Sequence, residues 1–154
     1  MATLSYDAVY SSFLSNVTDY KLASQDDETT DEVMKEALHK AVASPFISRI
    51  LDELTMDDTE ETITYTLKNS TTDDRDNDYL TKVLGKQMVC EWLTPQLNST
   101  TMLAQMFAGK EQKFYSQAAH FTEMRNVVEN ATREVKMLIT DRTSYMNSYT
   151  EAET

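Results

Sequence analysis

The sequence contains few of the residues that build tight turns or covalent cross-links. Among 154 residues there are two glycines, two prolines and one cysteine. A single cysteine cannot form a disulfide within the chain, and a reducing compartment is the simpler expectation. Sandwiches and barrels need many turns that glycine and proline supply, so this composition predicts a mainly helical protein. The length fits one domain with its own core.

Long apolar runs are missing too. No stretch approaches the roughly 18 apolar residues that are needed to span a bilayer, and residues 1–10 include Asp7 but no basic residue. We expect a soluble protein without a signal peptide and without membrane contact.

Catalytic and cofactor motifs are also lacking. The histidines are His39 and His120, the single thiol is Cys90, and the glycines Gly85 and Gly109 stand far apart. Phosphate-binding and dinucleotide-binding loops need closely spaced glycines, which this sequence does not have. The cysteine and the histidines are not part of a catalytic motif, and a Cys/His pair could come together in the fold only by chance. We therefore expect no enzyme activity and no cofactor.

The acidic stretch 69–78 is the most obvious place for a metal site. If its aspartates took the ligand positions of an EF-hand, Tyr79 would stand where the loop needs glycine and Gly85 where it needs glutamate. The motif fails at both positions. We expect a solvated loop and no bound metal.

Negative charge is concentrated in the first half of the chain. Residues 1–80 contain 18 acidic and 6 basic residues, whereas residues 81–154 contain 8 of each, so the first half carries the whole net charge of −12. Nucleic acids are bound mainly through Lys and Arg, so we expect no sequence-specific nucleic-acid binding. The acidity indicates either a solvated face that supports solubility or the wall of a channel along which DNA slides.

Apolar periodicity predicts a series of helices in the first half. Residues 4–17 and 33–42 each place apolar side chains on one side. Ser44 followed by Pro45 predicts a new helix start, with Ser44 as the N-cap. The backbone N–H of the first helical residue has no partner within the helix, so proline, which lacks this N–H, is tolerated at that position. The segment 46–54 again has one apolar face and predicts a short helix.

The second half is predicted to hold the longest helices. Residues 79–93 are apolar on nearly all sides, which indicates a central buried helix that Pro95 ends or bends, and residues 97–107 form another short helix. Residues 114–142 carry apolar positions at spacings of three and four, which predicts a helix about 43 Å long. It either packs within its own subunit or projects at its far end to meet a neighbour.

Residues 62–67 alternate threonine with Ile63, Tyr65 and Leu67, which predicts a half-buried strand. A lone strand leaves backbone groups unpaired. Two partners are open: a hairpin with a neighbouring stretch such as 54–57, or a strand from another subunit or a partner protein that pairs with Ile63, Tyr65 and Leu67.

The predicted fold is therefore a helical bundle with a long C-terminal helix, one small β element and an extended C-terminal arm. Residues 1–142 form the domain, with acidic loops at 21–29, 55–61 and 69–78. Residues 143–154 form the arm. Terminal arms are usually disordered until a partner binds them, and tyrosine in the arm and arginine in the preceding helix are residue types that are enriched at interfaces, so we expect the arm to become ordered when it docks.

Residues 88–149 contain, in order, a tryptophan–proline segment (91–95), the run GKEQKFYSQ (109–117), an arginine-bearing helix and an end rich in Tyr and Asn. This order resembles the head-to-tail connector (neck adaptor) proteins of long-tailed bacteriophages. Residues 1–78 match that family more loosely.

The resemblance implies a structural virion protein, assembled in the host cytoplasm, that forms a ring of copies, commonly twelve, in the virion neck. The ring would join the portal to a stopper or tail-completion protein and continue the DNA channel. By position, portal docking falls to Arg142, Tyr145, Asn147 and Tyr149, and the signature segment to Lys110, Lys113, Phe114, Tyr115 and Gln117.

Two other functions stay open. One is an acidic DNA mimic that inhibits a nucleic-acid-binding enzyme, although many acids cluster in predicted loops and not along a rigid surface. The other is a different neck or tail-completion role in the same virion.

Overall fold

The chain folds around two long helices. The computed structural model describes residues 1–17, 27–106 and 111–145, with side chains for 1–17, 30–98 and 121–142. The fold is mainly helical (69%), with a small three-stranded antiparallel sheet and a long C-terminal helix, which confirms the predicted class. The elements follow in the order β1 (Ala2–Ser5), α1 (Tyr6–Ser15), α3 (Asp27–Val42), α4 (Pro45–Ser48), β2 (Leu51–Asp57), β3 (Thr62–Leu67), α5 (Asp73–Met106) and α6 (Glu111–Tyr145).

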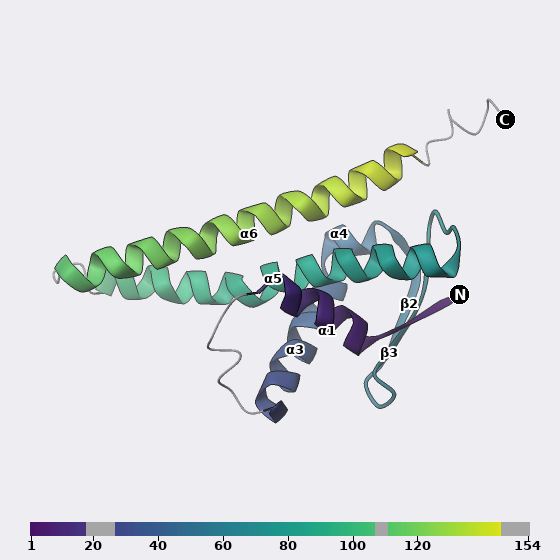
Figure 1. Ribbon diagram of the computed structural model, residues 1–154, viewed down its shortest axis with the longest axis horizontal. Coiled ribbons are helices and arrows are strands. Elements are labelled where there is room, and N and C mark those ends of the chain that lie inside the picture. Colours follow the sequence, from purple (N-terminus) through teal and green to yellow (C-terminus); the bar gives the residue numbers. More distant parts are fainter. Residues whose placement is uncertain (18–26, 107–110, 146–154) are drawn as a thin grey trace.

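Helix α5 is the centre of the molecule. It packs against α6 on one side and against α1 and α3 on the other (Figure 1). Its middle is mostly buried, as the sequence predicted, and its buried apolar residues there include Leu80, Val83, Leu84, Met88 and Val89. The distal parts of α5 and α6 run side by side beyond α1 and α3, so the two long helices form a hairpin that extends from the body (Figure 1).

The sheet has the strand order β1-β3-β2, and all neighbours are antiparallel. The predicted hairpin is confirmed, because β2 pairs with β3 within the chain. The opposite edge of β3 pairs with β1, where Leu4 lies opposite Ile63. Both edges of β3 are occupied by the same chain and Ile63, Tyr65 and Leu67 are buried, so their predicted pairing with another subunit or partner is wrong.

The N-terminal helix begins later than predicted. Residues 2–5 are extended in β1, with Ala2 and Leu4 buried, and α1 starts at Tyr6. Ser5 is the N-cap, and its Oγ accepts a hydrogen bond from the Ala8 N–H at 3.3 Å.

The single helix predicted over 46–54 is wrong, because this stretch is divided between a short helix and a strand. Ser44 and Pro45 start α4 as expected, but α4 ends at Ser48 and β2 begins at Leu51. The register of β2 shifts between Leu51 and Glu53. As a result Leu51 and Leu54, which are three residues apart, are both half-buried. This bulge in the strand imitates helical spacing in the sequence.

Two of the predicted acidic loops are shorter than expected. In the stretch 55–61, β2 continues to Asp57, and in the stretch 69–78, α5 starts at Asp73. Three aspartates occupy the first turn of α5, where negative charge is favoured by the helix dipole. The stretch 21–29 lies largely outside the described residues, with α3 starting at Asp27.

Helix α5 continues through Pro95, so the helix does not end there, and the separate helix predicted over 97–107 is the last part of α5 as far as Met106. Proline provides no N–H to the helix. The side chains on either side of Pro95 donate hydrogen bonds to carbonyls of the preceding turn. Thr94 Oγ1 donates to the Cys90 carbonyl at 2.6 Å, and Gln96 Nε2 donates to the Trp92 carbonyl at 3.3 Å.

Helix α6 confirms the long predicted helix and its apolar seam. Met124, Ala131 and Val135 are buried, and Val128 and Leu138 pack partly buried against the core. The helix runs to Tyr145, so the first three residues of the predicted arm are helical. Residues 146–154 of that arm lie outside the described residues.

Candidate interaction surfaces

The segment that carries the connector resemblance coincides with the α5/α6 hairpin. Trp92 and Pro95 lie within α5, while residues 111–117 belong to the first turns of α6. Of the signature residues, Lys113, Phe114, Tyr115 and Gln117 are in α6, with side chains outside the described part, and Lys110 lies outside it altogether. Tyr145 is the last helical residue, and Asn147 and Tyr149 lie beyond the described residues.

A polar cluster fastens the end of α6 to the start of α5. The Asp76 carboxylate accepts hydrogen bonds from Ser70 Oγ (2.7 Å), from the Thr71 N–H (3.1 Å) and from Thr71 Oγ1 (2.9 Å). Arg142 Nη2 donates to the same carboxylate at 2.9 Å and also to the Asn69 carbonyl. The Arg142 guanidinium lies 4.5 Å from the centre of the Tyr79 ring.

This cluster is buried and well satisfied. The side chains of Arg142 and Asp76 are 14% and 2% exposed. Burial by itself raises the pKa of Asp76, but the hydrogen bonds from Ser70, Arg142 and Thr71 outweigh it and hold the pKa below its usual range. The Arg142 side chain is therefore engaged within its own domain, and its role in portal docking stays a prediction.

A second cluster holds the β2–β3 turn against the helices. Asp58 Oδ1 accepts a hydrogen bond from the Tyr6 hydroxyl at 2.7 Å and lies 2.9 Å from His39 Nε2. Bonds from Tyr6 and His39 lower the pKa of Asp58. Lys35 Nζ lies 3.4 Å from Glu61 Oε1 on the same turn. The turn is thus fixed to α1 and α3 by polar contacts, most of them exposed.

An open groove of about 230 Å³ lies between α3 and α5. Apolar parts of Val33, Ala37, Trp92 and Pro95 line it, together with Glu36, Lys40, Glu91 and Gln96. Trp92 is half-buried. Its ring packs edge-to-face against the Phe13 ring, with 5.8 Å between the ring centres. An indole that is held in place and partly exposed is a typical anchor point for a protein partner.

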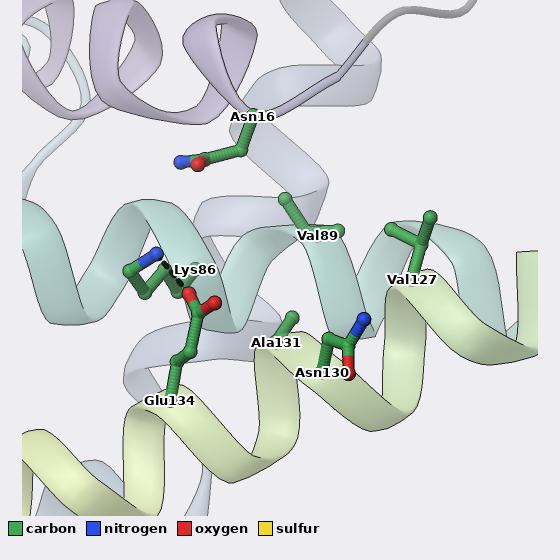
Figure 2. Close-up of a pocket in the computed structure, with 7 residues that line it drawn as sticks. All are labelled: Asn16, Lys86, Val89, Val127, Asn130, Ala131 and Glu134. Carbon is green, nitrogen blue, oxygen red and sulfur yellow. Dashed lines mark hydrogen bonds and ion pairs between the residues drawn. The ribbon is translucent and has the colours of Figure 1, made fainter.

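A second hollow lies where the end of α1 meets the α5/α6 pair. It is about 190 Å³ in volume, and Figure 2 shows Asn16 above it and the side chains of Lys86 and Glu134 pointing toward one another across it. Lys86 Nζ donates to Glu134 Oε2. The charged groups of this hollow are already paired within the chain, so it lacks an unsatisfied group that would bind a ligand.

Metal and membrane sites are not found in the described part of the chain. There, no three His, Cys, Asp or Glu side chains are grouped so as to hold a metal ion. Among the same residues, no helix combines the length and apolarity needed to cross a bilayer.

Sequence reasoning missed the partners of Arg142 and the groove beside Trp92. Asp76 and Arg142 are 66 positions apart, so no local pattern connects them. Trp92 lies in the stretch 79–93 that was predicted to be buried, and the sequence carried no signal for the groove beside it. Comparisons of the chain with protein-family models, curated proteins and solved structures find no match.

Proposed function

We propose that this protein is a structural component of the neck of a long-tailed bacteriophage. Copies form a ring, commonly of twelve, between the portal and a stopper or tail-completion protein, and the ring continues the DNA channel. The observation that carries the proposal is the order of segments in residues 88–149, of which 88–106 lie in α5 and 111–145 form α6.

The shape of the hairpin supports a connecting role. With 35 residues, α6 is about 52 Å long, so its two ends lie on opposite sides of the molecule. The hairpin end extends from α1 and α3 (Figure 1), and the other end of α6 contains residues 143–145, the first residues of the predicted arm. Two distant ends allow one subunit to contact two different neighbours, one on the head side and one on the tail side.

The placement of the acids favours a connector over a DNA mimic. Asp52, Glu53, Asp57, Glu60 and Glu61 are exposed on β2 and the following turn, so they belong to a hairpin and not to one straight helical face. A DNA mimic needs carboxylates along a rigid surface at phosphate-like spacing. An acidic hairpin suits the wall of a channel that DNA passes without binding. In this role the protein has no catalytic activity.

The test uses the full chain, a variant that lacks residues 146–154, and the portal protein of the same phage. Mass photometry should show complexes with the portal for the full chain and none for the shortened variant. Circular dichroism should show that both have the same helix content, because α6 ends at Tyr145. A matched control replaces residues 146–154 with a Gly/Ser segment of equal length, which should also fail to bind.

Two results would contradict this function. One is portal binding that does not change when residues 146–154 are removed or replaced. The other is a stable monomer that ignores the portal and binds a basic DNA-binding enzyme, which would promote the DNA mimic.

A further inference from the structure

The groove between α3 and α5 has the composition of a docking site. Its apolar lining includes the half-buried Trp92 and Pro95, and two carboxylates, Glu36 and Glu91, stand beside them. Lys40 Nζ lies 2.7 Å from Glu36 Oε1, so one of the two acids already has a cation. Glu91 accepts a hydrogen bond from Gln87 at 3.0 Å but has no ion pair among the described residues. The groove therefore combines an apolar surface with one unneutralised negative charge.

The outer face of α6 offers the complementary features. Met137 is 56% exposed, more than any other large apolar side chain described except Met1. Arg133 lies one turn before it on the same face of the helix. Arg133 donates a hydrogen bond to Asn130 at 2.5 Å and forms no ion pair with a described residue. Met and Arg are both enriched at the centres of protein interfaces.

We propose that Met137 and Arg133 of one copy dock into the groove between α3 and α5 of a second copy. The methionine side chain packs on Trp92 and Pro95, and the guanidinium pairs with Glu91. One contact matches an apolar side chain with an apolar surface, and the other matches a cation with a carboxylate, neither of which has an ion pair with a described residue. The interface also covers the exposed part of the only tryptophan in the chain.

The positions of the two surfaces determine what this contact builds. Because α5 lies between α6 and α3, the Met137 face and the groove are on different sides of one molecule (Figure 1). A contact between unlike surfaces is heterologous, and it generates a ring when its rotation closes. The inference rests on the proposed ring and assigns the residues that join neighbouring copies in it.

The test mixes two variants that each damage one surface. Met137→Asp removes the apolar contact from α6, and Glu36→Lys with Glu91→Lys reverses the charge of the groove. Each variant alone should be monomeric by analytical ultracentrifugation, with self-association weakened about tenfold or more. An equimolar mixture should form a heterodimer, because one intact α6 face then meets one intact groove. An interface between like surfaces would not be restored by mixing.

Two exposed sites provide matched controls. Val127→Asp places the same charge on α6 ten residues before Met137, about 15 Å away along the helix, at a residue that is 42% exposed, and should leave association unchanged. Glu60→Lys makes the same charge change on the β2–β3 turn, at an exposed residue that does not line the groove, and should have little effect. All substituted residues are exposed or half-buried, so circular dichroism should show unchanged folding.

Trp92 fluorescence gives a second readout. Its emission should shift to shorter wavelength as the wild-type protein is concentrated, and Met137→Asp should abolish the shift. The proposal is overturned if the wild type stays monomeric up to its solubility limit, or if neither variant changes its association. It is also overturned if the groove variant loses portal binding while the protein alone never self-associates, since the groove would then serve the portal. Portal binding that depends on residues 146–154 tests the proposed function separately.

Discussion

At the scale of single residues, Gly85 fixes how closely two helices approach. A Cβ atom at this position would lie 2.4 Å from Ser12 Oγ and 2.8 Å from Ser12 Cβ. The hydroxyl of Ser12 can rotate away, but its Cβ cannot move without shifting α1. The small residue is therefore required by the packing of α1 on α5.

We predict that Gly85→Ala destabilises the protein by about 2 kcal/mol, even though alanine is the better helix former. Urea unfolding would measure the loss. In a Ser12→Gly background the same substitution should cost much less, because both obstructing atoms are gone. Equal effects in the two backgrounds would show that α1 and α5 are not in close contact at this point.

Arg142 is the second residue whose role is structural. Replacing it with Met keeps much of its packing on Tyr79 but leaves the Asp76 carboxylate buried without a cation. Loss of one partner from a buried pair costs about 3 kcal/mol. Thermal and urea unfolding should both report the loss, and Arg133→Met on exposed α6 surface is the control that should change stability little.

Asp76 should also make stability depend on pH. Its pKa is lowered in the folded state, so its contribution is fully present above the ordinary aspartate pKa of about 3.9 and is lost as the pH falls through the folded-state value. Asp76→Asn should lower stability at pH 7 and reduce the further loss below pH of about 4. Parallel curves for the two proteins would show that another carboxylate is responsible.

At the scale of elements, the sequence predicted those segments whose pattern is long and regular. Helix α6, the middle of α5 and β3 were predicted by periods that extend over many residues. Strand β1 was missed because four residues are too few to show a period, and it forms only because β3 offers a free edge. The bulge in β2 replaced alternation with a spacing of three, and a helix was predicted in its place.

The turn between β2 and β3 carries a measurable strain. Glu61 has a positive φ of 52°, a conformation that L-residues other than Asn and Asp rarely adopt. Its carbonyl still accepts a hydrogen bond from the Tyr6 N–H at 2.8 Å, which ties the turn to the start of α1. This hydrogen bond helps to hold Glu61 at positive φ, although a residue with a Cβ atom is strained in that conformation.

We predict that Glu61→Gly raises the free energy of unfolding by up to about 1 kcal/mol, because glycine adopts positive φ without strain. The ion pair with Lys35 is half exposed and contributes little. Lys35→Ala measures that contribution alone. A destabilised Glu61→Gly variant beside an unaffected Lys35→Ala variant would contradict the strain argument.

At the scale of the whole molecule, the central strand of the sheet, β3, is hydrogen-bonded on both sides, whereas the outer strands β1 and β2 each pair with β3 on one side. Among the described residues, strand β2 pairs only with β3, and its exposed acids at positions 52, 53 and 57 discourage pairing with another strand. Both edges of β3 are bonded and its apolar side chains are buried. The interior of the molecule therefore consists of β3 together with the middle of α5.

Hydrogen exchange should follow this division. Amides of β3 and of residues 80–90 in α5 should exchange slowest, at the rate of global unfolding, and the unpaired amides of β2 should exchange much faster. Mass spectrometry after peptic digestion would resolve these segments. Equal protection of β2 and β3 would mean that the outer edge of β2 is covered in solution.

The proline inside α5 gives the hairpin a mechanical property. Pro95 offers no N–H to the carbonyl of Glu91, so the helix is less stiff there than on either side. From Pro95 to Met106 the helix extends about 16 Å. A bend of about 10° at this point would move the end of α5 by about 3 Å. Such a bend would move the end of the hairpin while the buried residues of α5 between Leu80 and Leu93 keep their packing.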